Sequence, residues 1–189
     1  MKLTEIPEIF FNSKTKSPFE DCLICNKKLL KPETDYLIIK GYRYYKEYNK
    51  KDITLEISLC CKCEEMLDES YSDESMQRLH QYFSKNFNQS KILNRFKSKN
   101  YNIDDWISHC ACKDKHWKQT NSYYIYGWFN SSKLIYDFYQ PYMLSDEVMD
   151  ELVILLSNDT IDSLTKFSDI YTDFPPEFRK IFSKRIIHS

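Results

Sequence analysis

Cys22-Leu23-Ile24-Cys25 and Cys60-Cys61-Lys62-Cys63 decide the fold of this chain of 189 residues. In both motifs two residues separate the outer cysteines, and this spacing lets a tight turn present two thiolates to one metal ion. Structural zinc sites take four such sulfur ligands in a tetrahedron. We therefore predict one structural Zn²⁺ site whose ligands are Cys22, Cys25, Cys60 and Cys63.

The 34 residues between the two motifs predict a β-hairpin. Residues from Asp35 to Tyr45 and from Asp52 to Leu59 have the composition of strands, and in the second strand apolar residues alternate with polar ones from Ile53 onward. A polar turn at residues 46–51 connects the two strands. Because a hairpin ends beside its own start, it returns Cys60 to Cys25.

Helices are expected directly after this hairpin. Residues 64–67 begin a short helix, and Ser72 is a typical N-cap for a longer one with Met76, Leu79, Phe83 and Phe87 on its buried face. The exposed N–H groups at a helix start stabilise a thiolate, so this position suits the second cysteine pair. The order of knuckle, hairpin and helix resembles the treble-clef class of zinc folds.

The second half of the chain predicts another hairpin followed by helices. Aromatic-rich segments from Ser122 to Phe129 and from Lys133 to Tyr139 flank a polar turn, and Pro141 ends the second segment. Helices are expected to begin near Ser145, near Ser157 or Asn158, and at Pro175-Pro176. The fold class is therefore α+β: an N-terminal treble-clef-like zinc element, then a β-hairpin and C-terminal helices.

Two segments are expected to pack as one unit. Residues 1–90 form the zinc-stapled hairpin–helix part, and residues 91–189 contain a basic connector, the aromatic hairpin and the C-terminal helices. No acidic residue occurs from Ser75 to Ile103, which makes the junction basic. The sequence shows no internal repeat and no linker rich in Pro, Gly or Ser.

The composition excludes several enzyme classes. Gly41 and Gly127 are the only glycines, so no P-loop, Rossmann fingerprint, kinase Gly-rich loop or G-x-S-x-G elbow is present. An apolar leader is missing between Met1 and Phe11, and the 7 cysteines are an odd number that clusters in pairs. We expect a cytoplasmic protein with reduced thiols and no association with membranes.

Three cysteines lie outside the predicted zinc site. Cys61 is expected to be a buried free thiol. His109, Cys110, Cys112 and His116 offer the ligands of a possible second metal site, but their spacing matches no common zinc pattern. The favoured interpretation is that these four are ordinary core and surface residues. A catalytic Cys–His pair ranks lower, because no third group is evident to orient the histidine.

Four stretches of the chain resemble a family of uncharacterised bacterial proteins. The resemblance implies a cytoplasmic bacterial protein with a four-cysteine metal site and supports the ligand assignment made above. It implies no activity and brings no catalytic residues. The stretches are Asp21–Cys25, Cys60–Cys63, Ser72–Arg78 and Pro141–Ser145.

Three functions remain open, and a protein-interaction module stapled by zinc is preferred. Four cysteine ligands close the metal to water and substrate, which is typical of structural sites. The alternative is a nucleic-acid-binding protein, because the first hairpin carries tyrosines for stacking beside basic residues. An enzyme is the least favoured, since of the four histidines only His80 lies near the zinc element. The possible nucleic-acid contacts are Arg43, Lys46, Lys50 and Lys51.

Overall fold

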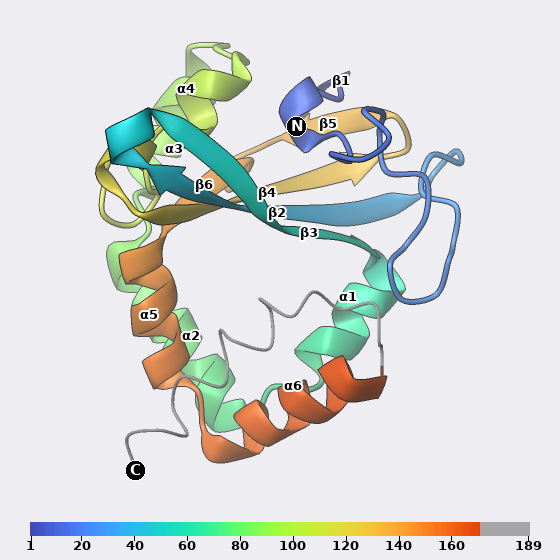
Figure 1. Ribbon diagram of the computed structural model, residues 1–189, viewed down its shortest axis with the longest axis vertical. Coiled ribbons are helices and arrows are strands. Elements are labelled where there is room, and N and C mark those ends of the chain that lie inside the picture. Colours follow the sequence, from blue (N-terminus) through green and yellow to red (C-terminus); the bar gives the residue numbers. More distant parts are fainter. Residues whose placement is uncertain (171–189) are drawn as a thin grey trace.

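The computed structural model describes residues 1–170 as one antiparallel six-stranded sheet with helices around it (Figure 1). The strands follow the order β1-β5-β4-β2-β3, and β6 pairs with β4. Strands from both predicted segments therefore share one sheet, and the division at residue 90 falls inside a helix. The strands are β1 (Lys2–Glu5), β2 (Asp35–Tyr45), β3 (Lys50–Cys60), β4 (Ser122–Asn130), β5 (Lys133–Tyr136) and β6 (Tyr142–Ser145).

Helices α1, α2, α5 and α6 lie on one side of the sheet, where α1 descends from the end of β3 and α5 from the end of β6 (Figure 1). The N-terminal segment and α4 lie on the opposite side. No helix within residues 1–170 combines the length and the apolar character that a membrane span requires. The helices are α1 (Cys61–Asp68), α2 (Asp73–Asn86), α3 (Gln89–Lys97), α4 (Ile103–Ile107), α5 (Asp146–Leu155) and α6 (Asn158–Ile170).

The central pair of strands, β2 and β4, builds the core. Strand β4 alternates half-buried and buried residues along its whole length, and β2 does so from Tyr36 to Lys40, as expected for a sheet with a packed face. Tyr36 and Phe129 stack with ring centroids 5.2 Å apart, and Phe10 packs edge-on against Phe129 at 5.2 Å. Such aromatic pairs add to the free energy gained from the buried area.

A β-bulge changes which face of β3 is buried. The register between β2 and β3 shifts between Gly41 and Tyr42. The sequence predicts that Ile53 shares the apolar face of β3, but 40% of Ile53 is exposed, because a bulge reverses the alternation beyond it. A Cβ at position 41 would lie 2.9 Å from Leu55 Cβ and from the Tyr124 ring, so only glycine fits there.

The predicted elements of the first half are confirmed. Both hairpin strands and the short helix after them are present, and Ser72 caps α2 by accepting the Ser75 N–H at 3.2 Å. The helix predicted at Pro175-Pro176 lies outside the described residues.

The predicted second hairpin is shorter than expected. Its second strand ends at Tyr136 rather than at Tyr139, because β5 leaves β4 after two residue pairs and pairs with β1 instead. After Pro141 the chain returns to β4 as β6, a strand that the sequence does not predict.

Candidate metal centre

The four predicted ligands come together in one cluster. Their four Sγ atoms all lie within 4.8 Å of one another, and the Sγ atoms of Cys25 and Cys60 are 3.6 Å apart. A tetrahedral zinc ion with Zn–S bonds of 2.3 Å separates its sulfur ligands by about 3.8 Å. The donor set and its spacing therefore fit a tetrahedral, thiophilic divalent ion.

A tight turn at residues 21–28, here called the first knuckle, supplies two of the ligands. The Cys22 N–H donates to the Lys27 carbonyl at 2.9 Å, and the Asn26 N–H donates to the Cys22 carbonyl at 3.0 Å. Asn26 has a φ of 56°, a left-handed conformation that asparagine tolerates better than most residues. The Leu23 N–H donates to the Ser58 carbonyl at 2.8 Å, which fixes the knuckle to β3.

The other two ligands lie where β3 becomes α1. Cys60 is the last residue of β3 and the N-cap of α1, while Cys63 lies in the first turn of that helix. The Cys60 N–H donates to Cys22 Sγ at 3.5 Å. The start of α1 therefore donates a hydrogen bond to the sulfur of Cys22. It also places the sulfurs of Cys60 and Cys63 in the same cluster.

The thiols of the cluster compete for negative charge. Burial disfavours the thiolate at Cys22, but N–H groups of Cys25, Cys60 and Ile24 more than compensate, so its pKa is lowered. Burial raises the pKa of Cys60 and of Cys63, and the charge on Cys22 raises both further. A divalent cation among the sulfurs removes this repulsion, which is why binding such an ion would release protons.

Exposure differs among the ligands. Cys22, Cys60 and Cys63 are buried, whereas Cys25 is exposed. Cys61 is not part of the cluster and is half-buried, not buried as the sequence predicts. Burial and the nearby carboxylates, Asp35 first among them, raise the pKa of Cys61. Cys61 is therefore a spare thiol with little thiolate character.

The segment proposed as a second metal site forms a turn of its own. His109 and His116 pair across its base, with ring centroids 4.9 Å apart. Cys110 is buried, and its Sγ accepts hydrogen bonds from the N–H and the hydroxyl of Ser145 at 3.4 and 3.5 Å. Burial raises the pKa of Cys112 to about 12. Among residues 1–170, the cluster of Cys22, Cys25, Cys60 and Cys63 is the one group with three or more ligand atoms close enough to hold a single metal ion. The side chains of residues 109–116 do not form such a group.

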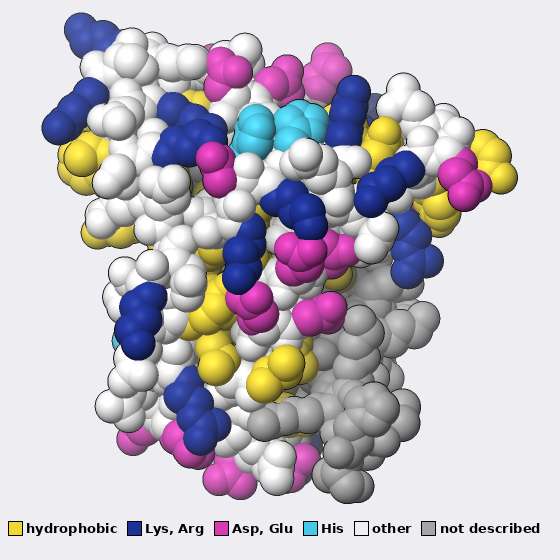
Figure 2. All heavy atoms as spheres, turned by 90° about the vertical axis from the view of Figure 1, so that its left-hand side faces the viewer, with side chains coloured by type: hydrophobic (Ala, Val, Ile, Leu, Met, Phe, Trp, Pro, Cys, Tyr) yellow, Lys and Arg dark blue, Asp and Glu magenta, His cyan; other side chains and the backbone are white. Residues whose placement is uncertain are grey.

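The basic residues of the first hairpin are partly engaged within the protein. Lys50 forms an ion pair with Asp52, and Lys51 lies over the rings of Tyr42 and Trp117 at 5.2 and 5.4 Å. Lys46 Nζ reaches the Gln119 carbonyl at 3.4 Å, and Arg43 is exposed. On the face that contains this hairpin, basic and acidic side chains are interspersed (Figure 2).

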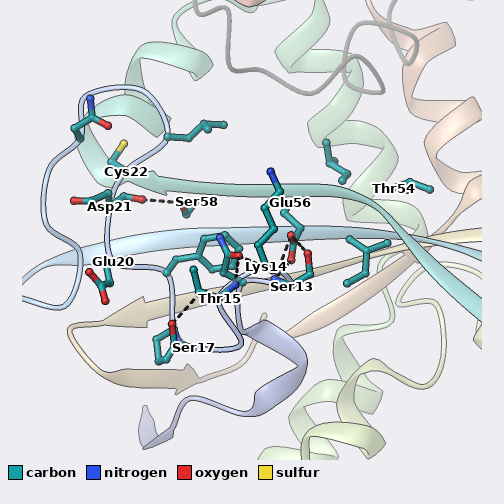
Figure 3. A pocket seen from close by; sticks show the side chains of 17 residues that line it. Ser13, Lys14, Thr15, Ser17, Glu20, Asp21, Cys22, Thr54, Glu56 and Ser58 are labelled. Carbon is teal, nitrogen blue, oxygen red and sulfur yellow. Dashed lines mark hydrogen bonds between the residues drawn. The ribbon is translucent and has the colours of Figure 1, made fainter.

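A groove lies beside β3, and no pattern in the sequence indicates it. It has a volume of about 760 Å³ and lies between the loop from Asn12 to Leu23 and the β3 residues from Ile53 to Ser58 (Figure 3). Cys22 and Asp21 line one end, and the Ser58 hydroxyl donates to the Asp21 carbonyl at 2.9 Å. The groove and the cysteine cluster therefore share a wall.

Comparisons of the chain with protein-family models, with curated proteins and with solved structures find no match in any of the three.

Proposed function

We propose that this protein binds one Zn²⁺ ion at Cys22, Cys25, Cys60 and Cys63, in a treble-clef-like element of knuckle, hairpin and helix. The observation that carries the proposal is that four sulfur atoms from two distant segments lie within 4.8 Å of one another. Sulfur at all four positions leaves no coordination site for water or substrate. The ion would therefore tie the first knuckle to the junction of β3 and α1 and perform no chemistry.

The metal content of the purified protein tests this first part. We expect about one zinc ion per chain by elemental analysis. A folded protein without metal would overturn the proposal. Treatment with a strong chelator should unfold or loosen residues 21–68, because metal binding and folding are coupled in small zinc sites.

We further propose that the protein is an interaction module that binds an extended segment of another protein in the groove beside β3. β3 is an edge strand of the sheet. The Ser58 carbonyl faces away from β2, since it accepts the Leu23 N–H. Alternation along an antiparallel strand then turns the N–H and carbonyl of Glu56 toward the groove. Edge groups of this kind recognise an added strand through main-chain hydrogen bonds.

The zinc ion would support this role indirectly. The loop that forms the opposite wall of the groove ends in the first knuckle, whose position depends on the cysteine cluster. The β3 wall is joined to this loop as well, because Glu56 accepts hydrogen bonds from the N–H and the hydroxyl of Ser13. Both walls are therefore held before a partner arrives, which lowers the entropic cost of binding.

Selection of peptides from a random display library tests the groove. Selected peptides should shift the amide resonances of Glu56 and Ser58 in the ¹⁵N-labelled protein, and the I53K variant should weaken their binding at least tenfold. I154K is the matched control, because Ile154 is exposed on α5 while Ile53 lines the groove. Peptides that leave the β3 amides unchanged, or that bind I53K as well as the unaltered protein, would contradict this role.

A further inference from the structure

Residues 109–116 form a second knuckle with the same hydrogen bonds as the first. The Cys110 N–H donates to the Lys115 carbonyl at 2.8 Å, and the Asp114 N–H donates to the Cys110 carbonyl at 2.9 Å. The φ of Asp114 is 54°, close to the 56° of Asn26. Cys110 therefore occupies the position of Cys22, and Lys113 that of Cys25.

The second knuckle also docks on a strand in the same way. The Ala111 N–H donates to the Met143 carbonyl at 2.8 Å, as the Leu23 N–H donates to the Ser58 carbonyl at 2.8 Å. In both cases the accepting residue lies two positions before a helix N-cap, which is Ser145 for α5 and Cys60 for α1.

The sulfur of the first cysteine makes the same contact in both knuckles. The Ser145 N–H donates to Cys110 Sγ at 3.4 Å, and the Cys60 N–H donates to Cys22 Sγ at 3.5 Å. Ser145 therefore takes the place of Cys60. Three residues later, Val148 takes the place of Cys63.

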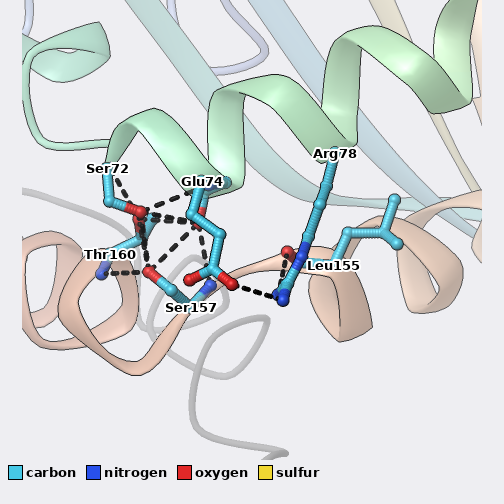
Figure 4. A network of polar contacts seen from close by, with 7 residues as sticks. Ser72, Glu74, Arg78, Leu155, Ser157 and Thr160 are labelled. Atoms are coloured by element: carbon cyan, nitrogen blue, oxygen red, sulfur yellow. Dashed lines mark hydrogen bonds and ion pairs between the residues drawn. The ribbon is translucent and has the colours of Figure 1, made fainter.

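Helices α2 and α6, which follow α1 and α5 in the chain, meet through reciprocal hydrogen bonds (Figure 4). The Ser72 N–H donates to Thr160 Oγ1 at 2.8 Å, and the Ser157 N–H donates to Ser75 Oγ at 2.8 Å. Ser72 and Ser157 each accept the N–H three residues further on at 3.2 Å. This exchange of identical contacts is what a two-fold axis between α2 and α6 produces.

The sheet obeys the same relationship. β2 and β4 are central, antiparallel neighbours, and Tyr36 and Tyr123 are the residues that pair with the N-caps Cys60 and Ser145. α1 and α5 descend from opposite ends of the sheet on the same side (Figure 1). The repeated order is knuckle, two paired antiparallel strands, helix and helix, and in the second copy β5 is inserted between the paired strands β4 and β6.

We propose that the chain contains two copies of one metal-binding unit, and that the second copy retains a latent metal position between Cys110, Lys113, Ser145 and Val148. The inference rests on the proposed function of the four-cysteine cluster. It revises the second-site prediction, since Cys112 takes the place of Ile24 and is not a ligand position. It also contradicts the expectation that the chain has no internal repeat.

In the second copy, packing, hydrogen bonds and ion pairs take the place of the bonds that a metal would form. Val148 is fully buried, and Ser145 Oγ lies 3.5 Å from Cys110 Sγ. Lys113 forms an ion pair with Glu151 of α5 at 2.8 Å. Lys115 forms another with Glu147 of α5 at 2.5 Å. The second knuckle is therefore fixed to its helix by ion pairs and hydrogen bonds.

Restoring the missing thiols tests the proposal. The variant K113C/S145C/V148C completes a four-cysteine set with Cys110 and should raise the zinc content from one to two ions per chain. The control D114C/D146C/M149C moves each new thiol by one residue and should stay at one. A folded K113C/S145C/V148C protein that binds one ion overturns the duplication.

A variant with fewer substitutions tests the proposal if K113C/S145C/V148C does not fold. K113C/S145C keeps the buried Val148 and supplies three thiolates, which should bind one additional Cd²⁺ with thiolate-to-metal absorption in the ultraviolet. Absence of that absorption in the folded variant, with the first site loaded, also overturns the duplication. A wild-type protein that binds no zinc would overturn the proposed function instead, so the two failures are distinguishable.

Discussion

Lys40 Nζ lies 2.9 Å from Glu56 Oε1, and only 3% of the lysine side chain is exposed. The two residues face each other across β2 and β3. Lys40 also donates to the Phe11 carbonyl at 2.5 Å, while Glu56 binds Ser13. This buried ion pair thereby fastens the N-terminal loop to the strand that forms the groove.

Removing the lysine charge should destabilise the protein strongly. K40M leaves Glu56 as a poorly compensated charge, and breaking such a buried pair costs about 3–5 kcal/mol. The control is K50M, because the Lys50–Asp52 pair is exposed and such pairs are worth about 0–1 kcal/mol. Urea denaturation of both variants measures the difference, and equal midpoints would contradict it.

The four ligand cysteines should differ from the spare thiols in thermal stability. C25S and C63S each remove one proposed metal ligand and should lower Tm sharply, because the metal would tie the knuckle to α1. C61S and C112S remove thiols outside the cluster and should change stability far less. Calorimetry of the zinc-loaded proteins checks this order, and four equal shifts would show that the distinction is wrong.

Cys112 should become reactive only at high pH. Burial raises its pKa from an ordinary value of 9.0 to about 12. A thiol with a raised folded-state pKa contributes stability below pH 9, and this contribution is lost as the pH rises toward 12. We expect iodoacetamide to alkylate Cys112 at a rate that still rises between pH 9 and 11, since only the thiolate reacts. A rate that levels off near pH 9 in the zinc-loaded protein would refute this assignment, with C112S as the blank.

The reciprocal contacts between α2 and α6 should be of similar strength. S75A removes the acceptor of the Ser157 N–H, and T160V removes the acceptor of the Ser72 N–H. Both donors are half-buried, and leaving a buried donor unpaired costs about 1–3 kcal/mol, so the two variants should lose similar amounts of at most this size. T160S keeps the hydroxyl and should recover most of the loss. Denaturation curves give the comparison, and a cost confined to one partner would contradict the symmetry.

Binding to nucleic acid should be weak and non-specific. Lys46 and Lys50 are exposed on the first hairpin, and of its tyrosines Tyr45 and Tyr48 are exposed as well. Tyr42 and Tyr44 are buried and unavailable for stacking, so the stacking surface is smaller than the sequence suggests. Any affinity for single-stranded RNA should fall with salt, and K46E/K50E should reduce the slope by about 0.7 per lost phosphate contact. Fluorescence anisotropy at several salt concentrations measures this. Micromolar or tighter binding at physiological salt, lost in the variant, would favour the nucleic-acid hypothesis.

The four-cysteine cluster and the first hairpin could be predicted because their signals are local. The spacing of Cys22 and Cys25 matches a metal knuckle, and the alternation before Cys60 matches a half-buried strand. Strands β1 and β6 have only four residues each, and Lys2 pairs with Tyr136 across most of the chain. Such short strands are stable through tertiary packing rather than through a local pattern.

The repeated unit is hidden by unequal spacing. Cys110 follows Cys22 by 88 positions, Tyr123 follows Tyr36 by 87, and Ser157 follows Ser72 by 85. Shorter connections in the second copy remove the fixed period that would reveal it, and the loss of three of four cysteines removes the motif. The buried Lys40–Glu56 pair could not be predicted either, because the residue opposite Lys40 depends on the register across a β-bulge.

The exposure of Cys25 has a consequence for how the proposed zinc site would exchange its metal. The other three cysteines of the cluster are buried, so an incoming thiol or chelator would reach Cys25 first. Exchange would then proceed by stepwise replacement of that ligand while three sulfurs still hold the ion, without global unfolding. Zinc occupancy would therefore follow the surrounding supply of zinc throughout the life of the protein, instead of being fixed when the chain folds.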